Sequence, residues 1–322
     1  MNDTKKPKPR PLKRWAWRIG RIIVIAYVGL AVLLALLQTQ LIFPGAATQG
    51  SPDSAVDPAQ LDAELVTMTT PGGEKVVALF GRALDASGQP HPDAKSRPTL
   101  IYFYGNAMCI AAAVEGGEFQ EFRRRGFNVM VPDYLGYGLS SGRPSEAGVY
   151  ATADACFDHL KQRGDAGGVD ANKIVPLGLS LGGGAAFYLA STRNEVPCVA
   201  TIAAFTSVDA MARKLFPYLP TGMLLKHHFD NESKLKKFGK PVFLAHGTRD
   251  GIIPFAMSQK LADAATAGGA KVIKYDVQGG DHNDIYDIGG TALLDAITQF
   301  VNEHGANPAG RAQAEGLSVE RP

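Results

Sequence analysis

The sequence predicts an α/β fold: a mostly parallel central sheet flanked by helices and preceded by one N-terminal transmembrane helix. Segments typical of buried strands alternate with helical segments from residue 99 to residue 204. A Gly-x-Ser-x-Gly turn joins one of these strands to a helix at residues 178–182. A basic N-terminus precedes a long apolar run. With 322 residues, 45% of them hydrophobic, the chain can bury one sizeable core.

The N-terminus has the pattern of an uncleaved membrane anchor. Residues 1–21 form a basic tail in which eight Lys and Arg residues stand against Asp3 alone. Residues 22–43 are apolar and cover the roughly 20 residues that a bilayer requires. The positive-inside rule keeps the basic end in the cytoplasm and sends the rest of the chain to the non-cytoplasmic side, periplasmic or lumenal. The alternative is a cleaved signal peptide, which usually has a shorter apolar region and a smaller basic one.

The rest of the chain divides into three parts. Residues 44–60 are rich in Gly, Ala, Ser and Pro, which is typical of a linker. The folded domain is expected over residues 61–304, and residues 305–322 are expected to be disordered because they lack apolar periodicity.

Within the domain, two segments are expected to form an opening antiparallel pair, and the alternating strands and helices follow. The pair is 63–68 with 75–80; the later strands are 99–104, 127–132, 173–178, 198–204, the apolar run from Pro241 and 271–277; the helices are 109–125, 147–163 and 181–192. Residues 206–239 interrupt this alternation with a cluster of aromatic and methionine residues, which forms either ordinary packing or a wall for an acyl chain.

The turn at residues 178–182 predicts a nucleophile. Glycines two positions either side of Ser180 let a strand and a helix pass closely through a sharp turn. That turn places the Ser180 hydroxyl at the tip of the sheet, above the N–H groups that begin the helix. The alternative is that Ser180 is only a small residue that packs the helix on the sheet.

A serine hydroxyl is a weak nucleophile, so it needs a base, and the base needs an acid to orient it. Asp250 follows the strand from Pro241, and His282 follows the strand 271–277 in a glycine-rich loop. Both are therefore expected at the same end of the sheet as Ser180. The alternative is that Asp250 only stabilises the turn, since Asp is common in turns. Asp281 is a weaker candidate acid because it adjoins His282 and is expected to point away from it, and His246 is expected to fill a structural slot under the loop.

Acyl transfer also needs two fixed N–H donors for the negative charge on the carbonyl oxygen. One is expected from Leu181, the residue after the nucleophile. The other is expected in the turn after strand 99–104, where Asn106 is the first choice and Ala107 the second. The alternative for this segment is a plain strand-to-helix turn.

These motifs together resemble α/β-hydrolases of the serine-aminopeptidase-like type, specifically their membrane-anchored branch with a short lid. The matching stretches are Tyr104–Ala107, Pro132–Gly142, Gly178–Gly182, His246–Asp250 and Gly280–Asn283. The resemblance implies a Ser180–Asp250–His282 triad in the chain order of that fold. It also implies that residues 206–239 are a short lid over a rather open site, and that residues 133–142 form a structural loop near its mouth. Tyr104 and Met108 depart from the usual His-Gly-Asn-Ala-Gly of this branch.

The sequence therefore predicts a serine hydrolase that cleaves an ester, thioester or amide through an acyl-enzyme and needs no cofactor. A carboxylesterase or lipid-ester hydrolase is the first choice, with a peptidase or protein depalmitoylase as the alternative. A catalytically inactive membrane-anchored binding protein is the alternative from another class. The net charge of +2 is too balanced to indicate a nucleic-acid partner. Three cysteines without metal spacing are expected to be buried free thiols; they are Cys109, Cys156 and Cys198.

Overall fold

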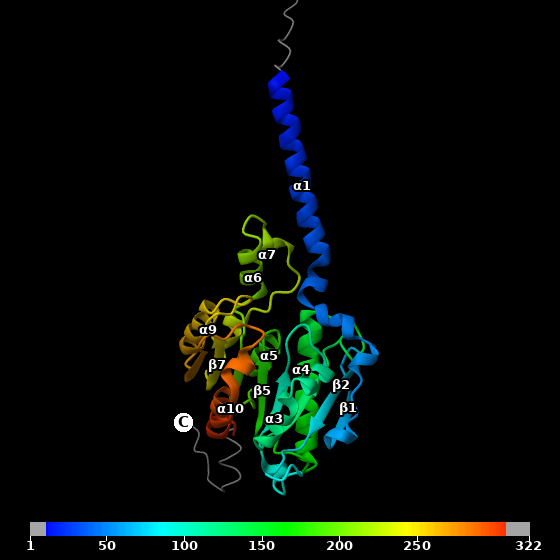
Figure 1. The fold of residues 1–322 in the computed structure, drawn as a ribbon, viewed down its shortest axis with the longest axis vertical. Helices are drawn as coiled ribbons and strands as arrows, with labels where there is room; N and C mark the ends of the chain where they lie inside the picture. The colour runs from blue at the N-terminus through cyan, green and yellow to red at the C-terminus, as the bar shows by residue number, and fades with distance from the viewer. Residues whose placement is uncertain (1–10, 307–322) are drawn as a thin grey trace, which may run out of the picture.

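The structure is a computed structural model that describes residues 11–306, with side chains from residue 14 (Figure 1). Residues 1–10 of the predicted basic tail and residues 307–322 of the predicted disordered tail lie outside the described residues.

A sheet of eight strands forms the centre of the domain, in the order β1-β2-β4-β3-β5-β6-β7-β8. The strands are β1 (Ala63–Thr69), β2 (Lys75–Gly81), β3 (Thr99–Phe103), β4 (Asn128–Pro132), β5 (Ile174–Leu179), β6 (Val199–Ile202), β7 (Val242–Gly247) and β8 (Val272–Val277). The antiparallel β1–β2 pair is confirmed, and β2 also runs antiparallel to β4. The strands from β4 to β8 in this order are parallel, so their carboxyl ends meet at one edge.

Helices cover both faces of this sheet (Figure 1). They are α2 (Ile110–Glu115), α3 (Glu118–Arg124), α4 (Glu146–Asp165), α5 (Gly182–Thr192), α9 (Ala256–Ala267) and α10 (Ile285–His304). The helix predicted over 109–125 is divided in two between α2 and α3. The division falls at Gly117, whose φ of +88° is incompatible with a continuous right-handed helix and unfavourable for other residues.

The N-terminal helix α1 (Pro11–Ile42) begins before the predicted 22–43 span because nothing in the preceding turns breaks it. Its segment Arg14–Ile42 is long and apolar enough to cross a membrane, and only 6% of its apolar window is buried against the rest of the protein. A helix in the core of a soluble domain would be mostly buried, so α1 is not one.

Residues 44–60 differ from the expected linker because they dock on the domain. They form three short 3-10 helices: η1 (Pro44–Thr48), η2 (Pro52–Ser54) and η3 (Ala59–Leu61). The N–H of Gly45 donates to the carbonyl oxygen of Asn106, and the N–H of Gly50 donates to that of Gly138, both at 2.9 Å. These contacts fix the direction in which α1 leaves the domain.

The segment 206–239 contains α6 (Val208–Leu215), α7 (Thr221–Leu224) and α8 (Asn231–Leu235). We use "lid" below for residues 206–239. The part with α6 and α7 stands beside the lower half of α1, above the carboxyl edge of the sheet (Figure 1). The lid is held from below by the carboxylate of Glu146, which accepts hydrogen bonds from the N–H groups of His228 at 2.6 Å and Phe229 at 2.8 Å.

Candidate active site

A strained turn between β5 and α5 carries Ser180. The φ of Ser180 is +54°, a left-handed conformation that non-glycine residues rarely adopt. A Cβ atom at Gly178 would lie 2.3 Å from the carbonyl oxygen of Gly182, and one at Gly182 would lie 1.9 Å from that of Phe103. Only glycine fits at both positions, so the Gly-x-Ser-x-Gly pattern is a steric requirement of this turn.

Three side chains from the carboxyl edge of the sheet lie in a connected row. The Nε2 atom of His282 lies 3.0 Å from the hydroxyl oxygen of Ser180. The Nδ1 atom of His282 lies 2.8 Å from Oδ2 of Asp250. The three residues follow β5, β7 and β8, so the parallel topology brings together side chains that are up to 102 positions apart in sequence.

The carboxylate of Asp250 is completely buried, and both of its oxygens have hydrogen-bond donors. The N–H groups of Ile252 and Ile253 donate to Oδ1 at 2.9 and 2.7 Å. Burial alone would raise the pKa of Asp250, but hydrogen bonds from His246 and His282 hold it well below its usual value. An ionised carboxylate only accepts, so it keeps a proton on Nδ1 of His282 and leaves Nε2 free to accept from Ser180.

Asp281 faces a different way from the imidazole. Its Oδ1 accepts from the N–H of Gly251 at 2.8 Å and from the N–H of His282 at 2.7 Å. These backbone hydrogen bonds lower the pKa of Asp281. Asp281 therefore joins the loop after β7 to the loop after β8 and does not contact the ring of His282.

The turn after β3 lies beside the serine. A Cβ atom at Gly105 would lie 3.7 Å from Cβ of Ser180, so the backbone at this position directly adjoins the nucleophile. Within residues 11–306, the N–H groups of Asn106 and Leu181 donate no hydrogen bond to another protein group. Two free donors from these residues are what the predicted oxyanion hole requires.

A buried carboxylate that the sequence reasoning left without a role supports this turn. Asp133 follows β4 and accepts hydrogen bonds from the hydroxyl of Tyr104 at 2.8 Å, the N–H of Ile110 at 2.8 Å and the N–H of Leu139 at 2.7 Å. Burial raises the pKa of Asp133, and the three hydrogen bonds, which lower it, offset only part of this effect. Asp133 thus ties the end of β3 and the start of α2 to the loop 133–142.

Two tyrosines of the same loop complete the support. The hydroxyl of Tyr137 donates to the carbonyl oxygen of Asn106 at 3.0 Å, and the hydroxyl of Tyr134 donates to that of Tyr104 at 2.8 Å. This hydrogen bond restrains the peptide between Asn106 and Ala107, which carries the N–H of Ala107 and directly follows the N–H of Asn106. The signal in the sequence is an acid and two tyrosines directly after a buried strand, where buried polar groups need partners.

A cavity of about 370 Å³ opens above Ser180 and His282. Three elements form its walls: the C-terminal turns of α1, the lid and the loop after β7. The wall residues from these elements are Leu34, Ala35, Gln38, Leu41, Ile42, Val208, Met211, Ala212, Leu215, Phe216, Leu219, Thr221, Leu224, Leu225, Ile252 and Ile253, and Phe205 joins them from directly before the lid. A wall from the lid is one of the two alternatives that the sequence offers for residues 206–239, whereas the contribution of α1 is not predicted from the sequence.

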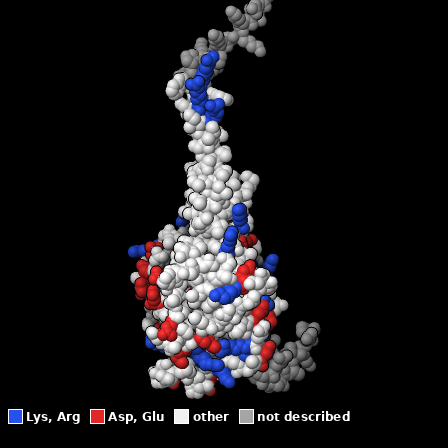
Figure 2. Space-filling view, turned by 90° about the vertical axis from the view of Figure 1, so that its right-hand side faces the viewer, with Lys and Arg blue, Asp and Glu red and all other residues white. Residues whose placement is uncertain are grey.

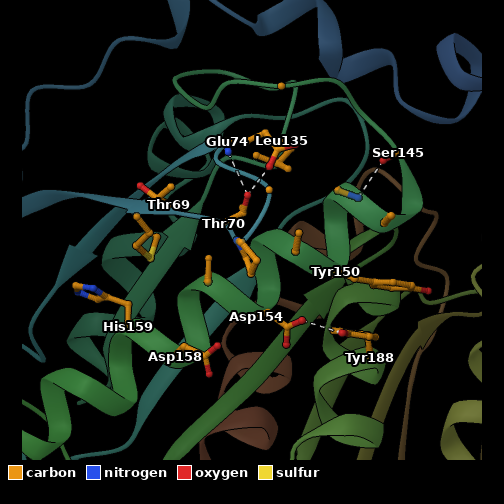
Figure 3. A pocket seen from close by; sticks show the side chains of 18 of the residues that line it. Thr69, Thr70, Glu74, Leu135, Ser145, Tyr150, Asp154, Asp158, His159 and Tyr188 are labelled. Carbon is orange, nitrogen blue, oxygen red and sulfur yellow. Dashed lines mark hydrogen bonds between the residues drawn. The ribbon is translucent and has the colours of Figure 1, made fainter.

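A second hollow, of about 1240 Å³, lies away from the triad, along α4 (Figure 3). Its wall includes Tyr150, Asp154, Asp158 and Tyr188. Its acidic groups are already paired: Asp154 accepts from the hydroxyl of Tyr188 at 2.8 Å, and Arg193 contacts both carboxylates. None of the triad residues lines it, so this hollow carries none of the candidate chemistry.

Comparison with known proteins agrees with this fold. The family model for the alpha/beta hydrolase fold matches residues 98–233. Protein Rv2307c of Mycobacterium tuberculosis is 32% identical over 241 residues, which cover 72% of this chain and 80% of that protein. The chain belongs to the α/β-hydrolase family.

Other relatives of this α/β-hydrolase include the alpha/beta hydrolase domain-containing protein WAV2 of Arabidopsis thaliana, 26% identical over 87% of this chain and 92% of that protein. Among solved structures, the Pyrococcus furiosus esterase Pf2001 is similar with a TM-score of 0.62 and 17% identity, over 78% of this chain and 97% of that one. A Mycobacterium tuberculosis puromycin-hydrolyzing peptidase is similar with a TM-score of 0.61 and 16% identity, over 75% of this chain and 39% of that one. At these identities the structural similarity shows the shared fold alone.

Proposed function

We propose that this α/β-hydrolase is a serine esterase that α1 holds in a membrane. One observation carries the proposal: a buried carboxylate, an imidazole and a serine hydroxyl lie in a row, with contacts of 2.8 Å from Asp250 to His282 and 3.0 Å from His282 to Ser180. This arrangement activates a serine because each group fixes and polarises the next.

In the proposed reaction, the Ser180 oxygen attacks the ester carbonyl carbon while Nε2 of His282 takes its proton. The negative charge that develops on the carbonyl oxygen is stabilised by the N–H groups of Leu181 and Asn106. His282 then gives the proton to the departing alcohol, which leaves an acyl group on Ser180. Water attacks this acyl-enzyme by the same steps in reverse order, and the acid is released.

The character of the cavity supports an apolar acyl group. Among the described residues that line it there is no Asp, Glu, Lys or Arg. A peptide with charged side chains or a free terminus would find no partner in such a site, and an unpaired charge is costly to bury. An ester or thioester with a hydrocarbon chain buries only apolar surface there, so these substrates are favoured over peptides.

The membrane part of the proposal follows from α1. Its basic first turns contain Arg14, Arg18 and Arg21, and its apolar part reaches Ile42 directly before the domain. This charge distribution favours a cytoplasmic N-terminus and a hydrolase domain on the opposite side of the membrane.

A fluorophosphonate probe tests the proposed chemistry on the full-length protein in isolated membranes, because it labels only a serine that is activated. We expect labelling of the wild type and of Ser87→Ala, which removes an exposed hydroxyl, but not of Ser180→Ala. An unlabelled wild type would instead favour the inactive binding protein. A panel of esters and thioesters of increasing acyl length would then identify the preferred substrate.

A further inference from the structure

We infer that α1 is a wall of the substrate site as well as an anchor, and that the substrate is a long-chain lipid ester taken sideways from the adjoining membrane leaflet. The inference rests on the proposed esterase function and goes beyond it by naming the substrate class and its route.

The first observation is the composition of the cavity wall. Leu34, Ala35, Leu41 and Ile42 each lie three or four positions from Gln38, so these five residues share one face of α1. That face borders the same cavity as Ser180 and His282. The helix that would span the membrane therefore borders the space in which the acyl group would lie.

The second observation is the height of the lid along α1. The hydroxyl of Tyr27 donates to the carbonyl oxygen of Tyr218 at 2.7 Å, and the amide of Gln38 donates to that of Leu224 at 3.0 Å. The two contacts on α1 are eleven residues apart, which is about 16 Å along a helix. A hydrocarbon core is about 30 Å thick, so a lid of this height reaches well into one leaflet.

The buried side chain of Gln38 fastens the lid and is not free for a ligand. Its amide nitrogen donates to the carbonyl oxygens of Ala35 and Leu224, at 2.7 and 3.0 Å. Its oxygen accepts from the N–H of Lys226 at 2.6 Å. Gln38 therefore joins the lid to α1 beside the cavity that both elements line.

The third observation is what the lid exposes. Leu215, Tyr218 and Met223 have 64%, 88% and 82% of their surface exposed, which is unfavourable in water but not in a leaflet. Arg213, Lys214 and Lys226 of the lid are exposed as well. Long cationic side chains next to an apolar surface can extend to lipid phosphates while their stems stay in the hydrocarbon.

The surface view agrees with this arrangement. On the face that Figure 2 shows, the column above the domain has no acidic or basic side chain between the basic turns of α1 and a few cations near its base. A lipid ester in that leaflet would already lie beside α1 and the lid, which both line the cavity. Its acyl chain would enter the apolar cavity, and its carbonyl would reach Ser180 without the chain crossing water.

A matched pair of substitutions on α1 tests the wall. In the full-length protein reconstituted in phosphatidylcholine vesicles, Ala35→Phe places a ring where α1 borders the cavity, whereas Ala26→Phe places the same ring on an exposed position outside it. The ring takes up space that a long acyl chain needs and an acetyl group does not, so we expect the ratio of kcat/KM for a palmitoyl ester to that for an acetyl ester to fall about tenfold in Ala35→Phe. Ala26→Phe should leave the ratio unchanged. An unchanged ratio in Ala35→Phe would overturn the inference.

A depth measurement tests, independently of any activity, whether the lid lies in the leaflet. The three native cysteines are buried, so a cysteine introduced at Met223 is open to selective labelling with an environment-sensitive fluorophore. In vesicles that contain spin-labelled phosphatidylcholine, we expect strong quenching at Met223→Cys and none at Ser87→Cys, in the loop between β2 and β3 at the opposite edge of the sheet. No quenching at Met223→Cys would overturn the inference. An inactive wild type with a quenched lid would overturn the esterase proposal but leave the lid in the leaflet.

Discussion

His246 contacts Asp250 from below the site: its Nε2 atom lies 3.2 Å from Oδ2, the same oxygen that contacts His282. The same nitrogen lies 2.9 Å from the carbonyl oxygen of Ile253, so one N–H is shared between the acid and the loop that carries it. The ring is buried and packs edge-on against Phe255. His246 thus holds the same carboxylate oxygen that contacts His282, and we regard it as a positioning residue.

The first prediction concerns this contact. His246→Phe keeps a ring in the slot but removes the donor, so Asp250 should orient His282 less well. A hydrogen bond to a charged group contributes about 1.5–3 kcal/mol, which corresponds to a loss in kcat of roughly tenfold or more with little change in KM. His246→Gln, which keeps an N–H donor, should recover part of the loss, and His304→Phe at the end of α10 should have no effect. Equal losses in His246→Phe and His246→Gln would show that only packing matters at this position.

The second prediction concerns the nucleophile. Ser180→Ala removes only the hydroxyl, and alanine tolerates the φ of +54° about as poorly as serine does, so the fold should be unaffected. Removal of a triad nucleophile lowers kcat by a factor of about 10⁴–10⁶. Ester hydrolysis and the melting temperature of the purified full-length protein measure both effects. Substantial activity in a folded variant is incompatible with the mechanism.

The third prediction ranks the two acids. Asp250→Asn replaces an acceptor beside Nδ1 of His282 and allows the wrong tautomer, so kcat should fall by about 10²–10⁴ with little change in KM. Asp281→Asn should have a small effect, since Asp281 contacts only backbone N–H groups. The reverse order in two well-folded variants would assign the acid to Asp281.

The fourth prediction concerns the lid and pH. Burial lowers the pKa of Lys234 from an ordinary value of 10.5 to about 8. The negative charge of Glu146 acts in the opposite direction but is the smaller effect. Between these pH values the unfolded chain binds the proton and the folded protein does not. The contribution of Lys234 to the free energy of unfolding therefore increases as the pH rises through this range and decreases as the pH falls.

A comparison of melting temperatures in detergent measures this effect. The difference between the wild type and Lys234→Met should grow in favour of the wild type from pH 8 to about pH 10. Lys237→Met, which changes an exposed lysine of the same segment, should show no such trend. A flat difference for Lys234→Met would mean that the amine has an ordinary pKa.

Much of the fold can be predicted from the local sequence pattern, because a buried parallel strand is an apolar run with turn residues at each end. The division between α2 and α3 does not, since a glycine such as Gly117 takes a positive φ only where tertiary packing demands it. The docking of residues 44–60 is equally hidden: the N–H groups of Gly45 and Gly50 and the side chains of Thr48 and Gln49 all bond to backbone groups, which leave no trace in composition.

The residues of the candidate triad are easier to find from sequence than their surroundings. Ser180, Asp250 and His282 each follow a strand, so the topology alone predicts that they meet. The contribution of α1 to the cavity depends on the direction in which the helix leaves the domain, which the docked residues set. The role of Asp133 depends on which donors surround a buried carboxylate, and these come from three separate elements.

The last prediction concerns the membrane topology. A signal peptidase that cut after Leu37 would cleave within α1 and remove Leu34 and Ala35 from the cavity wall, whereas an uncleaved helix keeps the wall intact. We therefore expect the full-length protein to stay with membranes after a carbonate wash, and a protease to reach the hydrolase domain only from the non-cytoplasmic side. Replacing Arg14, Arg18 and Arg21 by glutamate should reduce the fraction with this orientation, because positive charges next to the span determine its direction. A soluble protein that begins near residue 45 would identify the segment as a signal peptide, and the cavity would then lack its α1 wall.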